Sequence, residues 1–309
     1  MKKLIMLMMV GVLILSFTAC SEKKSNTVET KKPLIIGLMA SEDATPFILA
    51  EEKKYLDKYN VLVSYEIFKS AKDRDAAFQA GSLDGIVGDQ VAIALYQNAD
   101  FDVKIASYTD CDFMLIASKE SGIKSINDVV GKRVAISEKT VIEYTLDRML
   151  ESYDINPEVV IKTLIPAIPT RVEMLNNNKV DLALLPEPFA TLALNDGGIL
   201  LERASNIGLK PSVIAFTQEA IDNKREEITL FFDAYDDAIE YANNTPISEY
   251  EDIVINTVGY PEDMKGKVVF PKLEKSGLPS EEALQSAIDW VEAYGLNKKT
   301  LTPKDLIIE

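Results

Sequence analysis

The chain has 309 residues, of which 47% are hydrophobic and 27% are charged, a composition typical of globular proteins. Its formal net charge is −16, which makes it a poor partner for nucleic acid, whose phosphates need a basic surface. It has no histidine, which excludes Ser-His-Asp and Cys-His catalysis and His-based zinc or copper sites. We expect no metal and no cofactor, although a carboxylate or lysine mechanism stays open.

The first predicted element is a secretory signal. Lys2 and Lys3 precede an uncharged run over residues 4–17, which is too short to cross a bilayer as a helix. The run ends in SFTAC, which resembles the lipobox of bacterial lipoproteins. This resemblance implies a signal peptide over 1–19 and acyl chains such as palmitate on Cys20. The alternative is an uncleaved anchor or an incidental cysteine.

Acyl chains on Cys20 would hold the protein on the cell membrane, facing outside the cytoplasm. Residues 20–32 would then be the lipidated cysteine and a solvated tether, because SEKKSNTVETKK has no apolar periodicity. The second cysteine, Cys111, would have no disulfide partner, and a lone cysteine is most often a small buried hydrophobic residue.

From Pro33 onward, strands alternate with helices in two successive series. The expected strands are 34–40, 61–68, 84–88, 102–108, 113–119, 133–137, 159–165, 181–185 and 213–217. Helix starts and ends are marked between them, for example by Thr45-Pro46 and by Gly81. This alternation predicts mainly parallel α/β sheets. After residue 217 the pattern is mostly helical, and we expect Trp290 to serve packing.

An internal similarity predicts two similarly built halves. Residues 76–95 and 173–194 each contain a helix, a tight turn, a strand that begins at Asp, a polar loop and another apolar helix. In this alignment Asp84 matches Asp181, and Asp89 falls near Glu187.

Five segments, in their order and spacing, resemble the substrate-binding proteins of ABC importers. They match the nitrate/sulfonate/taurine branch, which also includes binders of thiamine pyrimidine precursors. The segments are PFILAEEKKYLDKYNV, RDAAFQAGSLDGIVGD, GIKSINDVVGKRVAIS, VDLALLPEPFATLA and IDWVEAYGLNKK. Together they extend over most of residues 33–309.

The resemblance implies an α/β fold of the two-lobed periplasmic-binding-protein-like type (type II), with two hinge strands and a helical C-terminal tail. Lobe 1 would comprise 33–110 plus 213–309, and lobe 2 would comprise 111–212. The protein would be a monomer, and it would bind its ligand without acting as an enzyme. It would close on a small-molecule ligand and deliver it to a transmembrane permease with its ATPase.

The physics of open α/β sheets places the ligand beyond the carboxyl ends of the strands, at the starts of helices. Several polar loops lie there, and each residue has a structural alternative as a helix cap or first-turn acid. Arg171 has two alternatives: a bidentate bond to a ligand carboxylate, or a pair with Glu187 or Glu143. The candidate ligand-binding residues are Ser41, Glu42, Asp43, Thr45, Ser70, Asp89, Ser137, Glu138, Thr140, Tyr144, Arg171 and Glu187.

The acids among these residues favour a ligand with nitrogen donors, such as an amine or a nitrogen-rich ring like the thiamine pyrimidine. A taurine-, sulfonate- or nitrate-like anion is the alternative, bound by hydroxyls and backbone amides at helix starts. Two other classes are open. One is a lipoprotein that presents ligand to a sensor. The other is a pyrimidine-synthesising relative, which the resemblance ties to a histidine that this chain lacks.

Overall fold

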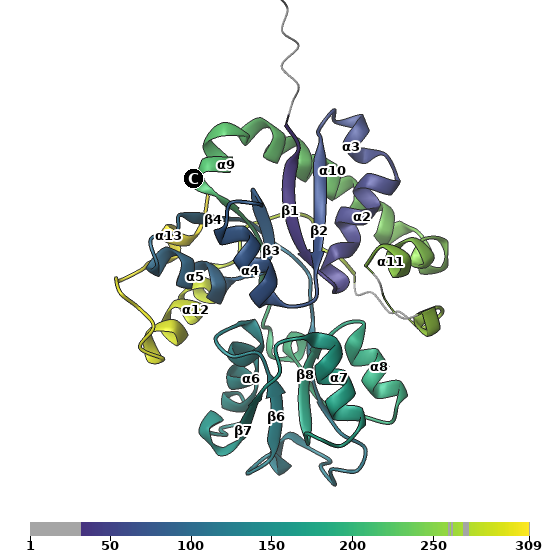
Figure 1. Cartoon of the computed structure of the whole chain (residues 1–309), viewed down its shortest axis with the longest axis vertical. Coiled ribbons are helices and arrows are strands. Elements are labelled where there is room, and N and C mark those ends of the chain that lie inside the picture. Colours follow the sequence, from purple (N-terminus) through teal and green to yellow (C-terminus); the bar gives the residue numbers. More distant parts are fainter. Residues whose placement is uncertain (1–31, 259, 261, 268–271, 309) are drawn as a thin grey trace, which may run out of the picture. The chain divides into compact units, whose positions relative to one another are not determined.

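The computed structural model describes residues 32–258, 260, 262–267 and 272–308 (Figure 1). The predicted signal peptide, Cys20 and the tether up to residue 31 lie outside the described residues. Pro33–Glu309 forms one compact unit. In the part of the chain that the structure describes, no helix is long and apolar enough to span a bilayer.

Five strands form the first sheet, in the spatial order β2-β1-β3-β10-β4. Their bounds are β1 Leu34–Met39, β2 Val63–Phe68, β3 Gly85–Asp89, β4 Val103–Tyr108 and β10 Ser212–Thr217. β1 is parallel to β2 and β3, whereas β10 lies antiparallel between β3 and β4.

The second sheet repeats this arrangement in the order β7-β6-β8-β5-β9. Its strands are β5 Phe113–Ala117, β6 Arg133–Ile136, β7 Ile161–Leu164, β8 Leu182–Pro186 and β9 Ile199–Arg203. β6 is parallel to β7 and β8, and β5 lies antiparallel between β8 and β9. β9 is not among the strands expected from the sequence.

In each sheet one strand is antiparallel to the other four. This strand is β10 in the first sheet and β5 in the second, and each is the first strand after the chain crosses from the other sheet. The expectation of mainly parallel sheets is therefore right for strand direction. It missed the two reversed strands, because alternation of strands and helices does not show where a chain changes sheets.

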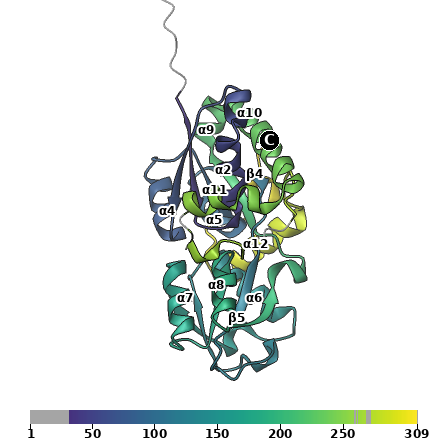
Figure 2. The ribbon, with the colours of Figure 1, turned by 90° about the vertical axis from the view of Figure 1, so that its right-hand side faces the viewer.

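Helices cover both faces of the two sheets and bury four apolar cores. On the first sheet, α2, α10 and α11 pack on one face and α4, α5 and α12 on the other. On the second, α6 covers one face and α7 and α8 the other (Figure 2). Their bounds are α2 Thr45–Glu52, α4 Ala71–Gln79, α5 Gln90–Asn98, α6 Val141–Glu151, α7 Ile168–Asn176, α8 Phe189–Asn195, α10 Arg225–Asn244, α11 Glu251–Val258 and α12 Glu281–Ala293.

Shorter helices complete the chain. They are α3 Tyr55–Lys58, α9 Gln218–Asn223, α13 Pro303–Leu306, and 3-10 helices at Glu42–Ala44, Ile126–Asp128, Pro157–Val159, Ala204–Ile207, Ile247–Glu249 and Glu262–Met264. The predicted helix signals are right to within one residue. Thr45 was expected as the N-cap of α2 but is its first helical residue, with Ala44 as the N-cap, and Gly81, with φ +76°, follows the end of α4 as expected.

The predicted internal similarity corresponds to a structural repeat, because the two sheets have the same strand order. Asp84 accepts a hydrogen bond from the backbone N–H of Ile35 at 2.7 Å, where β3 begins beside β1. Asp181 accepts the equivalent bond from the N–H of Arg133 at 2.8 Å, where β8 begins beside β6. Each aspartate thus ties the starts of two neighbouring strands together, which aligns their carboxyl ends.

Candidate functional site

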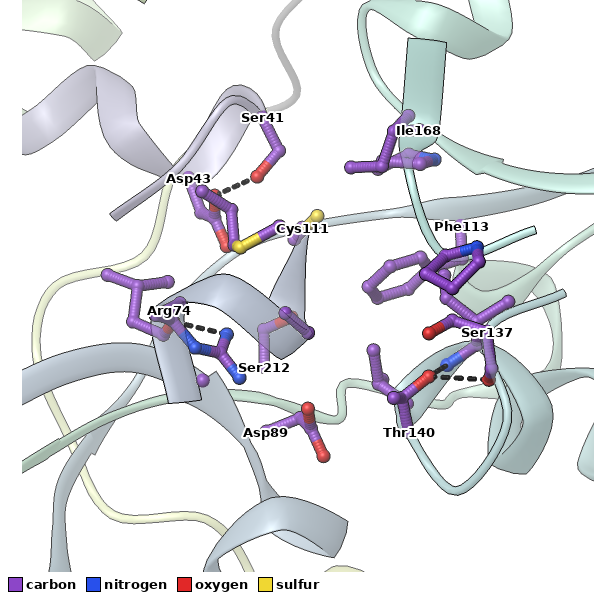
Figure 3. Close-up of a pocket in the computed structure, with 18 of the residues that line it drawn as sticks. Ser41, Asp43, Arg74, Asp89, Cys111, Phe113, Ser137, Thr140, Ile168 and Ser212 are labelled. Atoms are coloured by element: carbon purple, nitrogen blue, oxygen red, sulfur yellow. Dashed lines mark hydrogen bonds between the residues drawn. The ribbon is translucent and has the colours of Figure 1, made fainter. Parts of the chain in front are cut away.

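A pocket lies between the two lobes, at the carboxyl ends of strands from both sheets (Figure 3). Its unfilled space of about 520 Å³ includes the solvent of the open mouth, and the enclosed part is small, at about 50 Å³. Strand order explains the location, since β1, β3, β6 and β8 all end there. Its lining residues are Met39, Ser41, Asp43, Ala71, Arg74, Val87, Gly88, Asp89, Cys111, Phe113, Ser137, Thr140, Val141, Ile142, Pro166, Ile168, Arg171, Pro186 and Ser212.

The lobe 1 wall carries two buried carboxylates. Asp43 accepts a hydrogen bond from the Ser41 hydroxyl at 2.6 Å. Burial raises the pKa of Asp43 to about 6, although the Ser41 hydroxyl and the charge of Arg74 favour the ionised form. Asp89 caps α5 by accepting from the N–H of Ala92 at 2.8 Å. Each carboxylate therefore has a hydrogen-bond partner within the protein, and neither forms an ion pair with a described residue, although the charge of Arg74 favours their ionised forms.

Burial also raises the pKa of Asp89 to about 6, against the opposing effect of Arg74. The backbone N–H of Val141, at the start of α6 in lobe 2, is a further group that favours the ionised Asp89. A helix start is the usual seat of a bound anion. The protein's own carboxylate therefore faces the start of α6 across the pocket, and an anionic ligand would compete with it.

Arg74 is 3% exposed and is neutralised by the protein. Its guanidinium donates to the Val87 carbonyl oxygen at 2.7 Å and pairs with Asp75 at 2.7 Å. The charges of Asp75 and Asp89 both raise its pKa. The charge of Arg74 is therefore compensated by acids of lobe 1, and Arg74 is not available to an anionic ligand.

Arg171 has a different environment. It is 2% exposed and donates to the Leu184 carbonyl oxygen at 2.7 Å, while its Nε has no hydrogen-bond partner. Burial lowers its pKa to about 9, so the guanidinium is charged at neutral pH. The predicted structural pairs are wrong, because Glu143 pairs with Lys162 and Glu187 accepts hydrogen bonds from Thr191.

The remaining lobe 2 wall is mostly apolar. Figure 3 shows Phe113 and Ile168 facing the polar groups of lobe 1 across the pocket. Ser137 and Thr140 lie beside them, and the Thr140 hydroxyl donates to the Ser137 carbonyl oxygen at 2.8 Å while it accepts from the N–H of Ile142 at 3.2 Å. This wall suits the apolar face of a ligand, with a hydroxyl edge at the start of α6.

Half of the sequence-predicted ligand residues line this pocket, and half lie elsewhere. Those that line it are Ser41, Asp43, Asp89, Ser137, Thr140 and Arg171. Those outside the lining are Glu42, Thr45, Ser70, Glu138, Tyr144 and Glu187. For the six residues that line the pocket, contact with a ligand stays a prediction.

The two glutamates lie next to the pocket, at the crossing between lobes. Glu42 Oε1 accepts from the N–H of Asp112 at 2.6 Å, and the N–H of Glu42 donates to the Glu187 carbonyl oxygen at 3.2 Å. Burial raises the pKa of Glu42 well above its ordinary value. Both residues were expected to point at the ligand, and both instead bond to the backbone or hydroxyl groups around the crossing.

The other residues outside the lining have structural roles or point away. Ser70 caps α4 through Asp73, Thr45 is buried at the start of α2, and Glu138 is exposed. Tyr144 was expected to cover a flat ring. It is instead buried against Trp290 and donates its hydroxyl to the Ser286 hydroxyl oxygen at 2.9 Å.

Several pocket residues were not predicted, notably Arg74, Cys111, Phe113 and Ser212. Arg74 had a usable signal: the internal similarity begins two residues after Arg74 in one half and two residues after Arg171 in the other. Cys111 is buried, as expected for a lone cysteine, and burial raises its thiol pKa well above the ordinary value. Within the described ranges, no group of three or more Cys, Asp or Glu side chains is placed to hold a metal ion.

Comparison with solved structures defines the class of fold. The alkanesulfonate-binding protein of Xanthomonas axonopodis pv. citri, bound to MOPS, matches with a TM-score of 0.77 and 15% identity, over 89% of this chain and 98% of that one. The periplasmic aliphatic sulphonate binding protein of Escherichia coli matches with a TM-score of 0.76 and 16% identity, over 91% and 93%. The predicted periplasmic-binding-protein fold is confirmed.

The periplasmic nitrate-binding protein of Synechocystis PCC 6803 shares the fold, with a TM-score of 0.70 and 13% identity over 88% of this chain and 84% of that one. The family model described as NMT1/THI5 like matches residues 41–249. The chain therefore belongs to the NMT1/THI5-like family. A search of curated protein sequences gave no match.

Proposed function

We propose that this protein is an extracytoplasmic solute-binding lipoprotein that closes on a small organic ligand and delivers it to an ABC importer. The observation that carries the proposal is the pocket between the two lobes, which is built from strand ends of both sheets and has buried carboxylates in one wall. The family, the fold and the predicted lipobox at Cys20 support it. The partners would be a transmembrane permease and its ATPase, and the protein would act as a monomer.

The charges in the pocket favour a ligand with N–H donors, such as an aminopyrimidine or another nitrogen-rich ring. Asp43 and Asp89 are buried and form no ion pair with a described residue, since Arg74 pairs with Asp75. An amine or amino-substituted ring would supply the missing donors. Phe113 and Ile168 offer an apolar wall for the ring face.

A sulfonate or nitrate is the second candidate ligand, because the similar structures include proteins named for these anions. Ser137, Thr140 and the start of α6 are the groups that would bind it. Against it, Asp89 already faces that helix start, and binding an anion there would require Asp89 to move or take up a proton.

Binding rather than catalysis is the better account of the pocket. The resemblance ties pyrimidine synthesis in this fold to a histidine, and the chain has none. A lipoprotein that presents ligand to a sensor would use the same pocket and the same closure. Transport assays with and without the permease separate these two roles.

A thermal-shift screen on residues 21–309 tests the proposal. The panel would contain aminopyrimidines, other nitrogen heterocycles, polyamines, taurine, alkyl sulfonates and nitrate. A ligand at 100 times its Kd stabilises the native state by about 2.7 kcal/mol, which corresponds to a rise in melting temperature of roughly 4–5 °C for a chain of this size. A shift with nitrogen donors supports the proposal. Shifts confined to sulfonates or nitrate favour the second candidate.

Ligand-driven closure is expected to change the fluorescence of Trp290, the only tryptophan in the chain. Trp290 lies on α12, and its Nε1 donates to Asp147 on α6 of lobe 2 at 2.9 Å. A change in the relative position of the lobes alters this contact and the environment of the indole. Small-angle scattering should show a smaller radius of gyration at the same ligand concentrations. An unchanged radius at confirmed saturation contradicts hinge closure.

Replacement of Cys20 by alanine is expected to release the protein from membranes, because the substitution removes the acceptor of the predicted acyl chains. The measurement is the fraction of protein that sediments with membranes, compared with wild type and with Cys111→Ala as a matched control. Equal sedimentation of Cys20→Ala and wild type, with the signal peptide removed from both, contradicts the lipid anchor.

A further inference from the structure

Two buried arginines occupy equivalent positions in the two lobes. Arg74 is the fourth residue of α4 and Arg171 is the fourth residue of α7. Each donates through Nη1 to a carbonyl oxygen thirteen residues later in the chain, at 2.7 Å in both cases. The acceptors, Val87 and Leu184, are the third residues of β3 and β8. The repeat therefore places one guanidinium in each wall of the pocket.

The two guanidinium groups differ in their partners. Arg74 pairs with Asp75 and is influenced by Asp89. No described carboxylate lies within ion-pairing distance of Arg171, and the charge of no neighbouring group shifts its pKa. A buried cation without a counter-ion costs several kcal/mol, so proteins rarely keep one without a use.

We propose that Arg171 is a specificity-determining residue that binds an anionic oxygen of the ligand. This inference rests on the proposed function and narrows its ligand class. The ligand carries N–H donors toward Asp43 and Asp89 in lobe 1, and a carboxylate or similar group toward Arg171 in lobe 2. Such a ligand bonds to both walls of the pocket, which gives a physical reason for the lobes to close on it.

If Arg171 binds the anionic group of the ligand, the start of α6 does not have to bind it. Asp89 faces that start, whereas the Arg171 Nε has no hydrogen-bond partner. A carboxylate can accept two hydrogen bonds from one guanidinium, which fixes its orientation as well as its charge. The ligand class is therefore a small molecule with donor and acceptor ends, rather than a simple amine or a simple anion.

Two matched probes test the inference: 4-aminopyrimidine-5-carboxylate, and 4-amino-5-methylpyrimidine, which has the same ring and amine without the anionic group. We expect wild type to bind the carboxylate roughly 10- to 100-fold more tightly, the range for hydrogen bonds to a charged group. Arg171→Met should abolish this preference, and Arg171→Lys should retain part of it. Lys72→Met removes an exposed charge outside the pocket lining and is the matched control.

The outcomes separate this inference from the proposed function. Binding of the methyl probe with no preference for the carboxylate, or a preference that survives in Arg171→Met, overturns the role of Arg171 and leaves the ligand class intact. Failure of both probes to bind wild type counts against both. The melting temperature of unliganded Arg171→Met is the structural control, since a fall of many degrees would mean that Arg171 serves stability.

Discussion

Replacement of Arg74 by methionine is expected to lower the free energy of unfolding by about 3–5 kcal/mol, the usual cost of breaking a buried ion pair. Arg74 is the donor to the Val87 carbonyl oxygen and the partner of Asp75. It also favours the ionised forms of Asp43 and Asp89. Its loss leaves a buried carbonyl and several acids without compensation, while methionine fills much of the same volume.

Urea unfolding of the unliganded protein measures this effect, and Arg171→Met is the matched variant. It removes the equivalent arginine of lobe 2, which has one carbonyl partner and no described acid partner. Its loss removes one hydrogen bond worth about 1 kcal/mol and relieves a buried charge that costs at least as much, so Arg171→Met should unfold with a free energy equal to or above that of wild type. Equal losses in the two variants would contradict the assigned difference between the two arginines.

Binding of a nitrogen-donor ligand is expected to weaken as the pH falls below 6. Asp43 and Asp89, with pKa values of about 6, must be ionised to accept hydrogen bonds from the ligand. Between pH 7 and pH 5, protonation should reduce the affinity roughly 10-fold if one carboxylate is required and roughly 100-fold if both are. Calorimetric titration across this range, corrected for the ligand's own protonation, measures the slope.

Asp43→Asn and Asp89→Asn should each reduce the slope of the pH dependence. A slope of the opposite sign, with tighter binding at low pH, would contradict the nitrogen-donor ligand and indicate an anion that replaces Asp89 at the start of α6.

The stability of the unliganded protein gives an independent check of the two raised pKa values. A carboxylic acid whose pKa is raised on folding binds protons more strongly in the native state. The contribution of Asp43 and Asp89 to the free energy of unfolding should therefore decrease as the pH rises from 4 to 6, and it should stay constant above pH 6.

The fold was largely predictable because its signals are local. Apolar runs bounded by polar loops located nine of the strands, and Thr45-Pro46 and Gly81 marked a helix start and a helix end correctly. β9 was missed because it is a half-exposed strand, and ILLER has no alternation of apolar and polar residues. The reversed strands β5 and β10 were missed because direction is set by the crossings between lobes, which leave no local pattern.

The site was half predictable for a related reason. The strand-end rule located the correct loops, and Asp43, Asp89 and Arg171 follow from it. The rule does not say which side chain of a loop turns inward. Glu42 precedes Asp43 yet bonds to the N–H of Asp112, outside the lining of the pocket. Arg74 lies in a helix that the rule does cover, and comparison of the two repeats would have found it.

The most direct test of a ligand pocket between the lobes is a calorimetric titration of the strongest screening hit into wild type and Ala71→Phe. Ala71 lines the pocket at the first position of α4 and is half-exposed, so a phenylalanine there fills the space at little cost to folding. We predict one-to-one binding by wild type, and loss of binding by Ala71→Phe with an unchanged melting temperature. Equal affinities for the two proteins would place the ligand elsewhere and contradict the account.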